Sequence, residues 1–222
     1  ESLMSQTKKH YYSIKDTISL TTQAFIDGDY CDAIADDKLE TSNPATGEII
    51  ASFAHCKAAD VDRAVAAGRR VFNEGTWSRS APEYRKETLL RLAALVEQHK
   101  EELAVLESID AGKTITDCLH EVGTEAPAFF RWYAELADKT FGKIAPTGDD
   151  AMALIVKEPA GVAGAILPWN FPFLMAVWKI APALAAGCSI VVKPAEQTPL
   201  STIRLGALLN EAGVPAGVVS IL

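Results

Sequence analysis

The sequence predicts an α/β fold in which helices cover the faces of a parallel sheet. From residue 161 onward, short apolar segments rich in β-branched residues alternate with longer segments of helical character. Strands that alternate with helices in this way form parallel pairs, because each helix returns the chain to the same end of the sheet. The composition agrees: 49% of the residues are hydrophobic and 23% are charged, which is ordinary for a globular domain.

The alternation divides the end of the chain into five segments. Residues 161–167 are expected to form a buried apolar strand, and residues 172–186 the helix that follows. Residues 189–193 form the next strand, residues 199–212 the next helix, and residues 218–222 begin a third strand. So few strands leave apolar faces of a sheet uncovered, so we expect the chain to be the N-terminal piece of a longer polypeptide.

The start of the chain is expected to consist of short strands and turns. Asp27 and Gly28 lie between two β-prone segments, which indicates a hairpin over residues 25–30. A second turn covers residues 43–48 and precedes an apolar strand over residues 49–53. The sequence therefore predicts β-hairpins ahead of a helical region.

The helical region covers the middle of the chain, where apolar residues recur at spacings of three and four. The predicted helices are residues 60–75, a helix after a capping box of Ser80 and Glu83, a short helix that contains Leu103 and ends at Gly112, and residues 115–136. Residues 143–159 are expected to be extended, with a strand over residues 151–156.

Charge and hydropathy limit the partners. The chain has 21 basic and 29 acidic residues, a formal net charge of −8, whereas nucleic acids and anionic membranes require clustered Lys and Arg. Residues 1–9 are polar and lack the apolar core of a signal peptide. The apolar stretch over residues 171–192 is interrupted by prolines, a lysine and a glycine, so it does not predict a membrane span. We expect a cytoplasmic protein without nucleic-acid or membrane partners.

The chain contains four cysteines: Cys31, Cys56, Cys118 and Cys188. Their spacing is irregular and contains no Cys-x-x-Cys pair, so it predicts neither a zinc site nor a disulfide framework and fits a reducing compartment. Cys188 adjoins a predicted helix-to-strand turn, where a small buried residue is the expected occupant.

One loop joins the strand at residues 161–167 to the following helix. It contains Pro168-Trp169-Asn170-Phe171-Pro172, and loops at this end of an open α/β sheet bind ligands. The prolines stiffen the loop, and Pro172 suits the first turn of a helix. The side-chain amide of Asn170 can donate to a developing negative charge. Asparagine before a helix is also a common N-cap, and the sequence leaves both interpretations open.

A second candidate site follows the next strand, where Lys193 and Glu196 lie at its carboxyl end. Lysine can donate to ribose hydroxyls, and a glutamate can accept from two hydroxyls of one ribose. The alternative is an ion pair on the protein surface.

Together these loops resemble the signature of the aldehyde dehydrogenase superfamily. The matching segments are Asn170 within Pro-Trp-Asn-Phe-Pro, Trp178-Lys179, residues 182–187, and Lys193-Pro194-Ala195-Glu196-Gln197-Thr198-Pro199. Residues 43–48, Asp110-Ala111-Gly112-Lys113 and Tyr133-Ala134 extend the resemblance to nearly the whole chain from about Phe25 onward. The resemblance implies a Rossmann-like parallel sheet with flanking helices, N-terminal β-hairpins and a β oligomerisation arm, as part of a truncated aldehyde dehydrogenase fold.

The resemblance also implies a division of the chain. Residues 1–142 would be the N-terminal part of the NAD-binding domain, residues 143–159 the oligomerisation arm, and residues 160–222 the first βαβ unit of the sheet. The catalytic domain, with the nucleophilic cysteine and the deacylating glutamate, would lie beyond Leu222. An arm of this kind implies a homo-oligomer, either a dimer or a tetramer.

The family oxidises an aldehyde to a carboxylic acid through a thiohemiacetal and passes the hydride to NAD. Asn170 matches the asparagine that holds the oxyanion, and Lys179 matches a lysine linked to proton relay. Phe171, Met175 and Trp178 match positions that line the substrate tunnel, with helix packing as their alternative role.

The residues that the resemblance assigns to the cofactor form two segments: Ile166, Leu167, Pro168 and Trp169, and then Lys193, Pro194, Ala195 and Glu196. A carboxylate beside the adenosine ribose repels a 2′-phosphate, so NAD is favoured over NADP. A monovalent cation is implied near a further set of positions: Thr41, Ser42, Asp110 and Gln197.

Within the superfamily, residues 131–135 and 203–205 are most similar to γ-glutamyl-γ-aminobutyraldehyde dehydrogenases, which implies an amino-aldehyde from polyamine breakdown. Asp117, Glu121 and Glu125 recur every fourth residue and predict an acidic stripe on a helix. That stripe either attracts a cationic substrate or is a solvated face. A second hypothesis for the chain is a truncated, non-catalytic relative that binds NAD or self-associates without turnover.

Overall fold

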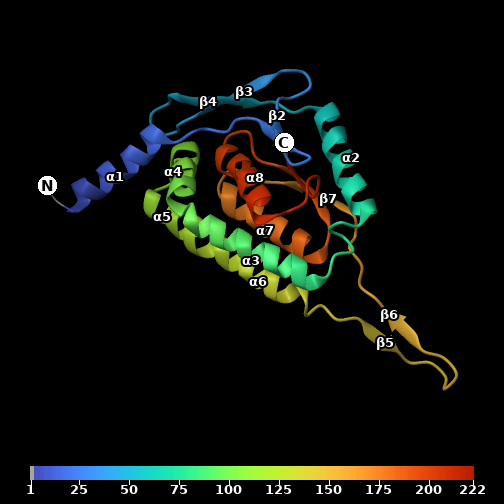
Figure 1. The fold of residues 1–222 in the computed structure, drawn as a ribbon. Helices are drawn as coiled ribbons and strands as arrows, with labels where there is room; N and C mark the ends of the chain where they lie inside the picture. Colours follow the sequence, from blue (N-terminus) through green and yellow to red (C-terminus); the bar gives the residue numbers. More distant parts are fainter. Residues whose placement is uncertain (1–2) are drawn as a thin grey trace.

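The computed structural model describes residues 3–222 and arranges helices around a five-stranded sheet (Figure 1). Its elements are α1 (Leu3–Thr17), β1 (Ala24–Ile26), β2 (Asp29–Cys31), β3 (Lys38–Ser42), β4 (Ile49–Ala54), α2 (Ala58–Glu74), α3 (Pro82–Gln98), α4 (Lys100–Ala111), α5 (Ile115–His120), the π-helical η1 (Glu121–Glu125), α6 (Ala126–Ala137), β5 (Lys143–Ala145), β6 (Ala153–Ile155), β7 (Val162–Ile166), α7 (Pro172–Ala186), β8 (Ser189–Lys193), α8 (Leu200–Ala212) and β9 (Val219–Ile221).

The main sheet has the strand order β2-β1-β9-β8-β7. β7, β8 and β9 are parallel, with Ala163 opposite Ile190 and Val191 opposite Ser220. The predicted parallel sheet is therefore confirmed. The predicted hairpin at residues 25–30 is confirmed as β1–β2, and it extends the sheet with two antiparallel strands through the pairing of Phe25 with Ile221.

Helices cover both faces of this sheet. On one face, α2 approaches β8 closely, and the Ser189 hydroxyl donates to the carbonyl of Gly68 at 3.0 Å. On the other face, Ile190 and Val192 of β8 point into the larger hydrophobic core, which includes the buried residues of α7 and α8. Helices α3 and α6 pack on the outside of α7 and α8, so the main core lies between the sheet and an outer helical layer (Figure 1).

The predicted boundaries of several elements are confirmed because their end signals are local. α7 begins at Pro172, whose missing N–H is harmless in a first helical turn. α2 and α4 end before Gly75 and Gly112, which adopt left-handed φ values of 81° and 71°. The β-branched run of β8 forms a strand with the predicted bounds.

Two predictions for the N-terminal half were wrong. Instead of strands and turns alone, the described part of the chain starts with α1, which packs against α4 and places His10 Nε2 3.2 Å from Glu101 Oε2. Its apolar stripe is too short to stand out in a polar segment. The predicted capping box of Ser80 and Glu83 does not form, because α3 begins at Pro82 and the Ser80 hydroxyl donates to the carbonyl of Trp77 at 2.7 Å.

The strand predicted at residues 161–167 exists as β7, but it is not buried. Ala163, Gly164 and Ile166 are exposed, and Ile166 retains 85% of its surface. The physical reason is position: β7 is the edge strand of the sheet and pairs only with β8.

The long helix predicted at residues 115–136 is divided by a π-helical turn. α5 leads into η1 and then into α6, which has a proline in its first turn. Because Pro127 has no N–H to donate, the regular helical bond to residue 123 is missing, and the wider π turn fits that gap. Because the hydrogen bonds of a π turn span one residue more than those of an α-helix, the side chains of η1 are rotated from the positions they would have in a regular helix.

The extended segment at residues 143–159 forms the hairpin β5–β6, which projects from the body of the protein (Figure 1). Ile144, Leu154 and Ile155 on it are exposed. The predicted strand over residues 151–156 is confirmed with shorter bounds as β6.

The four cysteines are free thiols, and Cys118 and Cys188 are buried. Across residues 3–222, none of the helices is long and apolar enough to cross a membrane.

The β1–β2 hairpin is docked on α8 around Gly206. The Tyr30 hydroxyl donates to the carbonyl of Ile203 at 2.7 Å and accepts from the amide of Ala207 at 3.0 Å. A Cβ added to Gly206 would lie 2.7 Å from Cγ of Phe25 and 2.9 Å from the Tyr30 hydroxyl. The hairpin and α8 therefore depend on a glycine at their contact.

We expect G206A to lower the free energy of unfolding in urea. Overpacking costs about 1–3 kcal/mol, which exceeds the gain of at most about 1 kcal/mol from replacing glycine in a helix. The control is G164A, which makes the same change to the unfolded chain at a site where nothing lies within 4 Å of the new Cβ. Equal stability of the two variants would contradict the close contact.

Candidate functional site

The N-termini of α7 and α8 are capped by carboxylates of a third helix, α4. Glu107 Oε1 accepts from the amide of Phe173 at 3.3 Å, and Asp110 Oδ2 accepts from the amide of Leu200 at 2.9 Å. The N-cap residues of α7 and α8 themselves provide no side-chain hydrogen bond. Carboxylates suit these places because a helix N-terminus has unpaired N–H groups and a positive partial charge. α4 thereby fixes the loops that follow β7 and β8.

Burial changes the acidity of both capping groups. Glu107 is fully buried, and its second oxygen accepts from the Ser201 hydroxyl at 2.6 Å. Desolvation raises the pKa of Glu107 to about 7, against the lowering effect of these hydrogen bonds. Desolvation likewise raises the pKa of Asp110 to about 6, and the hydrogen bond from Thr41 opposes that shift.

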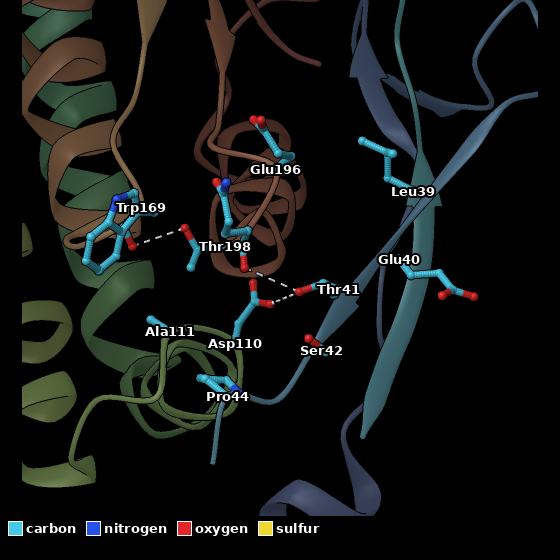
Figure 2. A pocket seen from close by; sticks show the side chains of 11 residues that line it. Leu39, Glu40, Thr41, Ser42, Pro44, Asp110, Ala111, Trp169, Glu196 and Thr198 are labelled. Carbon is cyan, nitrogen blue, oxygen red and sulfur yellow. Dashed lines mark hydrogen bonds between the residues drawn. The ribbon is translucent and has the colours of Figure 1, made fainter. Parts of the chain in front are cut away.

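A cavity of about 500 Å³ opens where the loops after β7 and β8 meet α4 and the β3–β4 hairpin (Figure 2). It is lined by Leu39, Glu40, Thr41, Ser42, Pro44, Asp110, Ala111, Trp169, Glu196, Gln197 and Thr198. The Thr198 hydroxyl donates to the carbonyl of Trp169 at 3.2 Å and so joins the two loops. The cavity lies at the carboxyl ends of parallel strands, where open α/β sheets bind ligands.

The four positions predicted for a monovalent cation all line this cavity. Thr41 donates to Asp110 Oδ1 at 2.5 Å and lies 3.4 Å from the carbonyl of Gln197. Figure 2 shows Thr41 of β3 and Asp110 of α4 pointing toward each other. The cation itself stays a prediction. Within the described residues, no cluster of three or more His, Cys, Asp and Glu is arranged for a metal ion.

The predicted cofactor residues divide into exposed and buried groups. Trp169 is 61% exposed and lines the cavity together with Glu196. Ile166 and Pro168, which precede Trp169 in the chain, are also exposed. Three others are buried: Leu167, Pro194 and Ala195.

Lys193 and Glu196 form an ion pair at the carboxyl end of β8, with Nζ and Oε2 2.7 Å apart. Both side chains remain about half exposed, so the pair is accessible to a ligand. The hydrogen bond from Lys193 lowers the pKa of Glu196, which keeps the carboxylate ionised.

Asn170 is exposed, and its side-chain amide makes no hydrogen bond to any residue that the structure describes. The N-cap interpretation was wrong, because the N-cap position of α7 is Phe171 and no side chain caps from there. The amide is therefore available to a ligand. Neither Asn170 nor the exposed Lys179 lines the cavity of Figure 2.

The three predicted substrate positions have different surroundings. Met175 packs against the main core, which is the alternative role considered for it. Trp178 is 41% exposed and lies 4.9 Å from the Phe129 ring. The Phe171 ring is partly exposed and contacts the ammonium of Lys113 at 3.8 Å from the ring centre.

The predicted acidic stripe is wrong. Glu121 is buried and paired with Lys113, whereas Asp117 accepts from the Thr114 hydroxyl at 2.8 Å. Glu125 instead pairs with a histidine, His120, at 3.2 Å. Residues four apart share a face only in a regular α-helix, and residues 121–125 are π-helical, so the three carboxylates do not share one face.

Sequence reasoning did not identify Glu107 or Lys113 as members of the site, and it assigned Glu121 to an acidic stripe instead of a buried pair with Lys113. A signal was present for Glu107, which lies one helical turn from Asp110 and on the apolar side of the predicted helix with Leu103 and Leu106. A carboxylate on an apolar face needs a buried partner.

Fold and cavity together define an α/β protein whose ligand loops follow neighbouring parallel strands. A family model described as the aldehyde dehydrogenase family matches residues 31–222. The chain belongs to the aldehyde dehydrogenase family, which confirms the resemblance found in the sequence.

Two curated relatives are similar over almost the whole chain. Aminoacetaldehyde dehydrogenase of Pseudomonas aeruginosa is 50% identical over 216 residues, which is 97% of this chain and 44% of the relative. The NADP/NAD-dependent aldehyde dehydrogenase PuuC of Escherichia coli is 46% identical over 206 residues, which is 93% of this chain and 42% of the relative. The chain thus spans less than half the length of these relatives.

Two solved structures superpose closely. Gamma-glutamyl-gamma-aminobutyraldehyde dehydrogenase from Burkholderia cenocepacia matches with a TM-score of 0.94 at 43% identity, over 96% of this chain and 43% of that chain. An indole-3-acetaldehyde dehydrogenase complexed with NAD⁺ matches with a TM-score of 0.93 at 42% identity, over the same two shares.

The raised pKa of Glu107 predicts a specific pH dependence of stability. Between its ordinary pKa of 4.5 and about 7, the folded protein holds a proton that the unfolded chain has lost. The contribution of Glu107 to the free energy of unfolding therefore has its full value below pH 4.5. It decreases as pH rises toward 7, by at most about 1.4 kcal/mol per pH unit.

We expect E107Q to remove this dependence, because glutamine keeps the volume and cannot ionise. Urea unfolding of both proteins from pH 4.5 to 7.5 measures the difference, in which the titration of all other groups cancels. A difference that is constant with pH would contradict the raised pKa.

Proposed function

We propose that the protein to which this chain belongs oxidises an aldehyde to a carboxylic acid through a thiohemiacetal, with NAD as the hydride acceptor. The observation that carries the proposal is the unpaired amide of Asn170, held in a loop beside a cavity at the carboxyl end of the sheet. Catalysis of acyl transfer needs such a fixed donor where the oxyanion develops. Membership of the aldehyde dehydrogenase family supports this role.

In this proposal the chain contributes the oxyanion donor and part of the cofactor site, and the nucleophile comes from elsewhere in the protein. A cysteine attacks as its thiolate, so a nucleophile needs a low pKa. Desolvation instead raises the pKa of Cys56 and of Cys118 to about 12, and burial also raises that of Cys31. Cys188 is buried at the turn between α7 and β8.

The residues at the carboxyl ends of β7 and β8 fit NAD. Bound NAD supplies the carbon that receives the hydride. Trp169 offers an exposed apolar surface in the cavity, and Glu196 offers an ionised acceptor for ribose hydroxyls, with Lys193 as the donor beside it. The negative charge of Glu196 disfavours a 2′-phosphate. The name of the Escherichia coli relative includes both NADP and NAD, so the preference needs measurement.

An amino-aldehyde is the substrate class we propose, with Lys179 as a proton-relay residue and Phe171 and Trp178 along the substrate path. The names of two similar proteins, aminoacetaldehyde dehydrogenase and gamma-glutamyl-gamma-aminobutyraldehyde dehydrogenase, support this class and a place in polyamine breakdown. Lys113 neutralises Glu121, so the proposal does not depend on an acidic stripe.

A second candidate function is self-association or NAD binding without turnover. The β5–β6 hairpin favours it, because Ile144, Leu154 and Ile155 are exposed on a projecting arm that a second copy would cover. Self-association by itself is compatible with the first candidate in a cytoplasmic homo-oligomeric enzyme, whereas an absence of turnover is not. Aldehyde-dependent NADH formation by the 222-residue chain alone would contradict a nucleophile outside it.

We expect N170A, in the protein that shows NADH formation, to lower kcat by about 10²–10³-fold and to change KM little, because the amide acts only on the developing oxyanion. Steady-state kinetics with an amino-aldehyde measures both constants. N73A is the matched control, since Asn73 is an exposed asparagine on α2 without a side-chain hydrogen bond to the described residues. Full activity of N170A would refute the assigned role.

We expect E196Q to raise kcat/KM for NADP relative to NAD roughly tenfold, because it removes the repulsion of a 2′-phosphate while keeping hydrogen-bonding capacity. The control is E74Q, which changes an exposed glutamate paired with Arg70 on α2. If the ratio of kcat/KM for NADP to kcat/KM for NAD is unchanged in E196Q, Glu196 does not contact the cofactor.

A further inference from the structure

The ammonium of Lys113 lies between the carboxylate of Glu121 and the loop that carries Asn170. Its Nζ is 2.5 Å from both oxygens of Glu121 and 3.3 Å from the carbonyl oxygen of Asn170. The same atom lies 3.8 Å from the centre of the Phe171 ring. An ammonium has three donors, and the neighbours of Lys113 provide three acceptor atoms and a π face.

The Lys113–Glu121 pair is largely shielded from bulk water, whereas the contact of Lys113 with the Asn170 carbonyl lies at an exposed position. The side chain of Lys113 is 19% exposed and that of Glu121 is 10% exposed. Charge-assisted hydrogen bonds are short and strong in such surroundings, whereas an unpaired charge there is costly. The lysine is therefore held in one place, and the Asn170 carbonyl next to it is held as well.

Two backbone features place the pair. Lys113 directly follows Gly112, whose left-handed φ of 71° ends α4 and turns the chain toward the α7 loop. A Cβ at Gly112 would lie 2.6 Å from Cγ of Pro44, so the turn also needs the space of a glycine. Glu121 is the first residue of the π turn, which turns its side chain inward. π turns of this kind occur frequently at functional sites.

We propose that Lys113 is a positioning residue for the Asn170 amide, acting through the Asn170 carbonyl and the Phe171 ring while Glu121 fixes the ammonium. This inference rests on the proposed role of Asn170 in holding an oxyanion. Fixing the carbonyl fixes the peptide plane between Asn170 and Phe171, and with it the position of the backbone from which the Asn170 side chain extends. A displacement of about 1 Å at a reacting centre can cost about 10²-fold in rate, so this restraint has a kinetic consequence.

The first test measures loop order and does not depend on activity. K113M/E121M removes both charges, so it leaves no unpaired buried charge to unfold the protein. We expect amide hydrogen exchange of a peptide covering residues 168–175 to become about tenfold faster, while exchange in α2 stays unchanged. The matched control is K139M/E135M, which removes an exposed Lys–Glu pair at the C-terminal end of α6.

Unchanged exchange over residues 168–175 would overturn the proposal. If exchange accelerates throughout the chain, K113M/E121M has lost its fold. The measurement is then made on E121Q instead. Glutamine keeps the volume and one acceptor oxygen of Glu121, so we expect a smaller acceleration that is still confined to the loop. An E121Q protein with wild-type exchange in the loop would also overturn the proposal.

The second test is a double-mutant cycle in the active protein. We expect K113M/E121M to lower kcat at least about tenfold without changing the dissociation constant of NAD. In the N170A background the same pair should have no further effect, because Lys113 acts through Asn170. Equal losses of kcat in both backgrounds would indicate a purely structural role. If N170A alone leaves kcat unchanged, the proposed function fails, and the exchange experiment still decides the positioning.

Discussion

Two buried carboxylates one helical turn apart on α4 determine how the site loops lie. Glu107 caps α7 and Asp110 caps α8, and both helices lack a cap of their own. Each cap satisfies one backbone N–H, that of Phe173 or that of Leu200, which would otherwise be unpaired inside the protein. Because one rigid helix provides both, the loop after β7 and the loop after β8 keep a fixed relation to each other. The cavity between them is therefore set by α4 as much as by the sheet.

Much of the fold followed from local signals in the sequence. Pro172 and Gly187 bound α7, and the β-branched run of β8 predicts a strand with the observed ends. Predictions failed where a local signal was weak or had a competitor. α1 has a short apolar stripe in a polar segment, and the potential cap at Ser80 is displaced by Pro82. The exposure of β7 depends on sheet order, which no pattern within the strand encodes.

The candidate site could be predicted only in part, for a related reason. Its loops were found because each is a contiguous segment of the sequence, Pro168-Trp169-Asn170-Phe171-Pro172 in one loop and Lys193-Pro194-Ala195-Glu196 in the other. Its supports were missed because Lys113 contacts the Asn170 carbonyl across 57 residues, and Glu107 contacts Ser201 across 94. The usable signal is a polar residue on an apolar helix face, since burial obliges such a residue to have a partner. Glu107 and Asp110 both meet that description.

The capping by α4 also has a consequence for how the chain assembles. The contact of Glu107 with α7 closes a segment of 66 residues, and that of Asp110 with α8 closes one of 90. Non-local contacts of this kind form slowly, because the chain between them must first be ordered. α4 leaves the ribosome long before the helices it caps, so its carboxylates stay hydrated until both arrive. We expect the two ligand loops to reach their final geometry in one late, shared step of folding.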